Sequence, residues 1–309
     1  MPRKSTKKAE RSSSPRVLKP SKGKMFGRTK VNNTVPSAWR IFRDSISFLK
    51  SHKKIFVSIS LIYLGLTMLL VRGFGLTTDL SLAKQSFEEL VNGAGGSFSS
   101  SAAVFGFLVN SNSPNSEVAT LYQSIIIVIM SLAIIWVLRQ THAREKVTLR
   151  DAFYKSTHPL VPFLLVLIFI GVQLIPLILG TFLFNTTIGS DIAIGLLEKT
   201  LWSTLSFLLV LWSTYLVSTS IFALYIVTLP DMTPIKALRS AKKLVRFRRW
   251  STMRKVLFLP IMLFVLMASI MFLTIMFLTP IAEVVFLVMI AAGLPVVHSY
   301  MYGLYRELL

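Results

Sequence analysis

Cysteine is absent from this chain of 309 residues. Without it the chain has no disulfide framework and no thiolate for catalysis or metal binding. The four histidines, His52, His142, His158 and His298, are too scattered to indicate a metal site. We therefore expect no metal and no cofactor, and cysteine usage does not identify the redox compartment.

Acidic residues are also few, because 13 Asp and Glu stand against 34 Lys and Arg. Hydrophobic residues make up 53% of the chain and the mean hydropathy is +0.64, which excludes an ordinary soluble domain. A strongly basic protein can bind nucleic acid, but here the basic residues flank apolar runs, where anionic headgroups attract them. We expect anionic membrane lipids as partners and no nucleic acid.

Six apolar runs approach the roughly 20 residues that a helix needs to cross a bilayer. They cover residues 55–71, 119–138, 160–180, 201–225, 256–278 and 281–301. With these spans, 31 of the 34 Lys and Arg fall on one side, and only Arg72, Lys84 and Lys199 fall on the other. The positive-inside rule predicts that the basic side, with both termini, is cytoplasmic. The sequence thus predicts an all-α, multi-pass protein of the cell (plasma) membrane, with six transmembrane helices in three hairpins.

The segments outside the spans differ in character. Residues 1–35 hold 11 Lys and Arg and one acid without any apolar run, which predicts a disordered cytoplasmic tail before a transmembrane domain at 36–309. The outer loop at 72–118 has apolar residues at helical spacing, which indicates short helices on the outer face, as a lid or an interfacial domain. Thr279–Pro280 predicts a tight turn between the last two spans.

A short amphipathic stretch precedes each pair of spans, and we expect each to be an interfacial helix on the cytoplasmic side. The second begins with a capping box, Thr148 with Asp151, and the third with Thr233 as N-cap and Pro234 at the first helical position. The apolar stripes of the first and third consist of Trp39, Phe42, Ile46 and Leu49 and of Ile235, Leu238, Ala241 and Val245.

One segment resembles a known group of bacterial membrane proteins. It reads LPDMTPIKALRS at residues 229–240 and is followed by Lys243, Arg246 and Trp250. The group includes the membrane domain attached to some glycerophosphodiester phosphodiesterases, and relatives of the YciC type. The resemblance implies an all-helical domain of the bacterial inner membrane over about residues 36–309, with no established chemistry of its own. It carries no catalytic residue over to this chain.

Few residues indicate chemistry. No Lys, Arg, Asp or Glu lies in the central part of a span, where ion-coupled transporters usually place them. In the last span, Glu283 and His298 can be read as a gate and a pH sensor, but an interfacial carboxylate and a packed imidazole are the favoured interpretations.

Serines recur every seven residues in the fourth span, at Ser206, Ser213 and Ser220. Such a stripe can line a polar cavity, but small residues on one helix face more often allow close helix packing, which we favour. Ser124 and Ser131 in the second span have the same spacing and are a candidate partner face.

The strongest site-like feature is a predicted basic helix at 236–255, with nine Lys and Arg and no acid. It can bind lipid phosphates or an acidic partner, or it can simply anchor the protein by the positive-inside effect. The candidate lipid- or partner-binding residues are Lys242, Lys243, Arg246, Arg248, Arg249, Arg254 and Lys255.

These observations favour a non-enzymatic integral membrane protein. We expect it to act in envelope lipid organisation, or as a scaffold that binds another protein or a second copy of itself. The alternative is a permease-like subunit for a hydrophobic or zwitterionic substrate, which the absence of charge within the spans permits.

Overall fold

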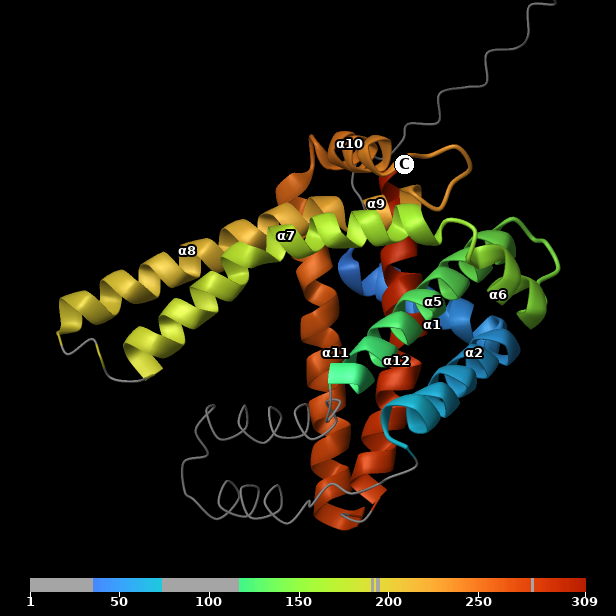
Figure 1. Ribbon diagram of the computed structural model, residues 1–309, viewed down its shortest axis with the longest axis horizontal. Coiled ribbons are helices and arrows are strands. Elements are labelled where there is room, and N and C mark those ends of the chain that lie inside the picture. Colours follow the sequence, from blue (N-terminus) through green and yellow to red (C-terminus); the bar gives the residue numbers. More distant parts are fainter. Residues whose placement is uncertain (1–35, 74–116, 190–191, 193–194, 279–280) are drawn as a thin grey trace, which may run out of the picture. The chain divides into compact units, whose positions relative to one another are not determined.

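The computed structural model describes residues 36–73, 117–189, 192, 195–278 and 281–309, and every regular element among them is a helix (Figure 1). The tail at 1–35, the helices predicted within 74–116 and the turn at Thr279–Pro280 lie outside these residues.

Six helical segments are long and apolar enough to cross a membrane, which confirms the predicted number of spans. Most of them continue beyond the apolar run, as α12 does to include Arg306, because helical hydrogen bonding does not stop where the hydrocarbon ends. The segments are α2 (Lys53–Leu66) with the π-helix η1 (Thr67–Val71), α5 (Glu117–His142), α7 (Leu160–Phe184) with the π-helix η2 (Asn185–Gly189), α8 (Leu196–Ser220) with α9 (Ala223–Ile226), α11 (Arg249–Leu278) and α12 (Ala282–Leu308).

Consecutive spans pack as pairs: α2 and η1 with α5, α7 with α8, and α11 with α12 (Figure 1). A buried apolar cluster joins the first pair to α12, through residues such as Ile59, Ile134 and Ala291. A smaller one, around Met271 and Phe286, lies between α11 and α12. The three predicted hairpins are therefore present, and the last span also closes against the first.

A shorter amphipathic helix precedes each hairpin in the chain, as predicted: α1 (Ala38–Ser51), α6 (Leu149–Ser156) and α10 (Pro234–Val245). Thr148 and Thr233 cap α6 and α10 through their hydroxyl groups, so both predicted N-caps are confirmed. The buried faces differ in part from the predicted stripes, because Trp39 and Ile235 are 54% and 69% exposed. Ala237 takes the inward position on α10.

The serine stripe of α8 packs against α7, which confirms the packing interpretation. The Ser213 hydroxyl donates a hydrogen bond of 2.7 Å to the Gln173 carbonyl of α7. Gly180 of α7 lies so close to Ser206 that an added Cβ would be 2.9 Å from the Ser206 carbonyl oxygen. The partner face of Ser206 and Ser213 is therefore on α7. On α5, the predicted partner, Ser124 is exposed and Ser131 is buried.

Both ionisable residues noted in the last span are buried. Glu283 pairs with Arg72, at the end of η1, and so does not lie free at the interface. His298 Nδ1 lies 3.1 Å from the Tyr225 hydroxyl, which confirms that this imidazole is packed.

Candidate functional site

The predicted basic helix at 236–255 is two helices. α10 ends at Val245 and α11 begins at Arg249. Between them, the Arg246 and Arg248 amides bond to carbonyls only three residues earlier, at 3.3 and 3.0 Å, which marks the tightened last turn of a helix.

The break separates the seven candidate residues. Lys242, Lys243, Arg246 and Arg254 are exposed, whereas Arg248, Arg249 and Lys255 are half-buried. The Arg249 guanidinium donates a hydrogen bond of 2.6 Å to the Tyr215 hydroxyl of α8 and lies over its ring. Arg249 therefore joins α11 to α8, and the four exposed residues remain a basic surface.

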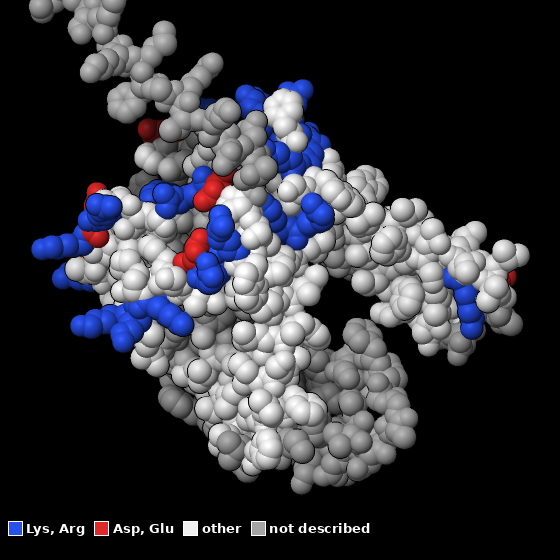
Figure 2. Space-filling view, turned by 180° about the vertical axis from the view of Figure 1, so that it is seen from behind, with Lys and Arg blue, Asp and Glu red and all other residues white. Residues whose placement is uncertain are grey.

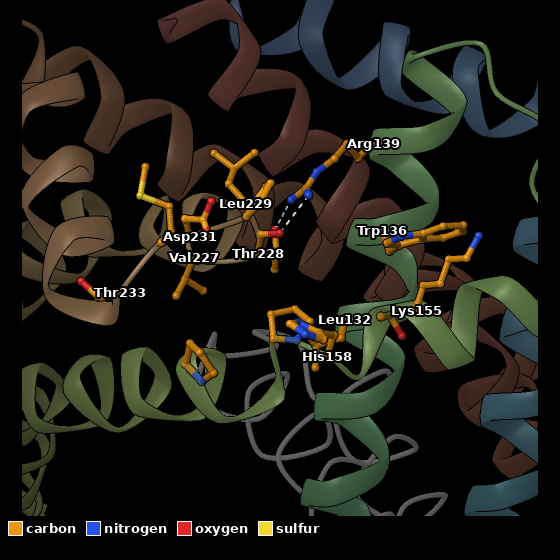
Figure 3. A pocket seen from close by; sticks show the side chains of 15 residues that line it. Leu132, Trp136, Arg139, Lys155, His158, Val227, Thr228, Leu229, Asp231 and Thr233 are labelled. Atoms are coloured by element: carbon orange, nitrogen blue, oxygen red, sulfur yellow. Dashed lines mark hydrogen bonds between the residues drawn. The ribbon is translucent and has the colours of Figure 1, made fainter.

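A cavity of about 640 Å³ opens instead between the end of α5, α6, the start of α7 and the loop from α9 to α10. Figure 3 shows Trp136, Arg139 and Lys155 on one side of it, with Thr228 and Asp231 across from them. Its lining consists of Leu132, Trp136, Arg139, Lys155, Ser156, His158, Pro159, Pro162, Val227, Thr228, Leu229, Pro230, Asp231, Met232 and Thr233.

Arg139, in the last turn of α5, holds the two walls together. Its guanidinium donates to the Thr228 carbonyl at 2.8 Å and also to the Thr228 hydroxyl (Figure 3). Two N–H groups in one plane suit this pair of acceptors, a geometry that lysine does not offer. Asp231 has φ of 59°, a left-handed conformation that aspartate tolerates better than most residues, and it turns the loop towards α10. The loop is thus tied to α5 at Thr228 and turns into α10 after Asp231.

Lys155 and His158 supply further basic groups at the mouth of the cavity. Lys155 Nζ lies 5.9 Å from the centre of the Trp136 ring and 3.8 Å from the Asp151 carboxylate. Asp151 is held in turn by the capping box of α6, where the Thr148 hydroxyl donates to it at 2.8 Å. Lys155 and His158 are both exposed, so they are accessible to a ligand.

The lining of the cavity contains both hydrogen-bonding and apolar side chains. Arg139, Lys155 and His158 can donate hydrogen bonds to a phosphate, and Asp231 can accept one from a hydroxyl or amine beside it. Trp136 and three prolines provide apolar surface. Within the described ranges, no group of three His, Cys, Asp or Glu could hold a metal ion. The arrangement suits an anionic headgroup that is partly surrounded by apolar surface.

None of the seven predicted site residues lines this cavity. Two features noted in the sequence nevertheless contribute to the cavity. Residues 229–233, part of the segment with the family resemblance, form one wall. The capping box begins α6, which belongs to the opposite wall. Neither feature indicates Arg139, because its role depends on the contact with Thr228, 89 positions away.

Lys and Arg gather over one part of the visible face, while most of the remaining surface is uncharged (Figure 2). Comparison of the chain with protein-family models, with curated proteins and with solved structures finds no match, so the cavity and its charges carry the functional argument.

Proposed function

We propose that this protein is a non-enzymatic, multi-pass membrane protein that binds anionic phospholipid headgroups on its basic side and so takes part in organising the lipids of the cell envelope. The observation that carries the proposal is the cavity lined by Arg139, Lys155 and His158 at the ends of α5 and α6. An anionic headgroup gains about 1 kcal/mol for each Lys or Arg near the membrane surface, which here are Arg139 and Lys155.

The orientation is part of the proposal. Lys and Arg outnumber acids at the ends of the spans that carry α1, α6 and α10, and the positive-inside rule assigns that side to the cytoplasm. Both chain ends are then cytoplasmic, in the plasma membrane. The cavity would face the inner leaflet, where phosphate groups lie at the depth of α6 and α10.

The chemistry of the lining favours binding over catalysis. Asp231 is the one carboxylate among the lining residues, so the cavity offers no pair of carboxylates for acid–base work. Arg139 is held by Thr228, whereas Lys155 is exposed and has a 3.8 Å contact with Asp151 on its own helix. Such groups are placed to recognise a charge.

The test is a calorimetric titration of the full-length protein, in a non-ionic detergent, with short-chain phosphatidylglycerol or phosphatidylcholine. We expect tighter binding of phosphatidylglycerol, an affinity that falls as salt rises, and at least a roughly tenfold weaker affinity for the double variant Lys155→Gln/His158→Gln. Arg150→Gln is the matched control, because Arg150 is exposed on the same helix but does not line the cavity. Equal affinity for the two lipids, or no effect of the double variant, would refute the proposal.

A further inference from the structure

A second hollow runs between α1, α2 and α12 and shares no residue with the Arg139 cavity. Its volume is about 510 Å³, and all but three of its lining residues are apolar. The lining consists of Ile46, Leu49, Lys50, Lys53, Phe56, Val57, Ser60, Leu61, Leu64, Val288, Ala291, Ala292, Pro295 and Val296. We call it the α2–α12 groove.

Small side chains leave this space open. Ser60 on α2 and the adjacent pair Ala291 and Ala292 on α12 line the groove beside larger aliphatic groups. Ala291 is buried in the apolar cluster that joins α12 to the first hairpin, whereas Val57 and Leu61 are 54% and 63% exposed. The groove therefore has a packed base and an apolar rim that faces outward.

Its charges lie at one end. Lys50 is in the last turn of α1 and Lys53 is the first residue of α2, on either side of His52, where the amphipathic helix gives way to the spanning one. Both lysines are exposed, and no described carboxylate pairs with either. This junction is the level at which lipid phosphates lie beside a span.

The length of the groove matches one leaflet. From Lys53 to Leu64 an α-helix rises about 16 Å, at 1.5 Å per residue. Half of a hydrocarbon core of roughly 30 Å is about 15 Å. The groove is thus about as long as one leaflet is thick, apolar along its length and cationic at the end where Lys50 and Lys53 lie.

We propose that the α2–α12 groove holds one acyl chain of an anionic phospholipid, with its phosphate between Lys50 and Lys53. This is a site for a retained lipid, separate from the headgroup cavity beside Arg139. It rests on the proposed insertion of the spans in a membrane, but not on binding in that cavity. A partner helix would also suit an apolar rim, but the two lysines at the end of the groove favour a ligand that carries its negative charge at the headgroup level.

The test counts retained lipids. Full-length protein is incubated in mild detergent with equal amounts of phosphatidylglycerol and phosphatidylcholine, washed extensively, and analysed for phospholipid per protein. Ala292→Phe fills the groove from an exposed position, and Lys50→Gln/Lys53→Gln removes its charges. We expect each variant to retain one phosphatidylglycerol fewer than the unmodified protein.

Matched controls are Val172→Phe, at an exposed position on α7, and Arg43→Gln, at an exposed position on α1, since neither residue lines the groove. Both should retain the full number of lipids. An unchanged number of phosphatidylglycerols in the groove variants, or a change of oligomeric state without loss of lipid, would each overturn the inference. Loss of a lipid from Lys155→Gln/His158→Gln alone would overturn it while leaving the proposed function intact.

Discussion

Arg72 and Glu283, 211 residues apart in the sequence, form a buried ion pair between the end of η1 and the start of α12. Their side chains are only 10% and 8% exposed. The pair ties the first span to the last on the side of the protein that has few basic residues. It complements the apolar cluster that joins the same two spans nearer their other ends.

Removal of one member of this pair should destabilise the protein more than removal of both. Arg72→Leu or Glu283→Leu removes one partner of this buried ion pair, and we expect a loss of about 3 kcal/mol in the free energy of unfolding. The double variant should lie closer to the unmodified protein, which thermal unfolding in detergent would measure. Additive losses in the double variant would show that the two side chains are not coupled.

The contact between α7 and α8 should tolerate no added methyl group at Gly180. A Cβ there would lie 2.9 Å from a backbone oxygen of Ser206, so we expect Gly180→Ala to cost about 1–3 kcal/mol in stability. Gly171→Ala, on the same helix with no atom within 4 Å of its added Cβ, is the control and should not destabilise the protein. Equal thermal stability of the two variants would contradict close packing at Gly180.

The hydrogen bond from Arg249 to Tyr215 should stabilise the contact between α11 and α8. Tyr215→Phe removes the acceptor of a charged donor, and we expect it to lower the free energy of unfolding by about 1–3 kcal/mol. Tyr154→Phe, at a side chain that is 82% exposed, should have no effect on stability. If Tyr215→Phe unfolds at the same temperature as Tyr154→Phe, the two helices are held together without this bond.

Local structure was predictable from the sequence because its causes are local. The apolar runs correctly predicted the six spans, and Thr148 and Thr233 correctly predicted where α6 and α10 begin. The seven-residue spacing of the serines correctly indicated a packed face on α8. Periodicity identifies a face but not the helix that covers it, so α7 as the partner could not be read from the spacing.

Tertiary relationships were not predictable in this way. Arg139 and Thr228 meet only because α5 and the loop before α10 pack side by side, and nothing in either segment names the other. The helix break after Val245 was not predicted within the basic run at 236–255. Charge alone does not distinguish Val245 from the residues around it. The cavity could not be predicted because it depends on the packing of α5 against the loop before α10, although the sequence indicated residues 229–233 and the capping box in its walls.

Topology can be tested in this chain by single introduced cysteines, since it has none of its own. We expect Lys242→Cys to react with a membrane-impermeant thiol reagent only after the cells are permeabilised, because the basic side is assigned to the cytoplasm. Leu197 is 83% exposed at the start of α8, on the side opposite the basic residues. We expect Leu197→Cys to react in intact cells. The reverse pattern of labelling would invert the proposed orientation.

An anionic headgroup in the cavity beside Arg139 is tested most directly by native mass spectrometry of the full-length protein, extracted gently from its own membrane. This measurement reports bound lipids and stoichiometric protein partners together. We predict a discrete anionic phospholipid on the unmodified protein and on Arg150→Gln, and one such lipid fewer on Lys155→Gln/His158→Gln. The same lipids on all three proteins would contradict headgroup binding in the cavity, and a co-purifying ATPase in place of lipid would favour a permease subunit.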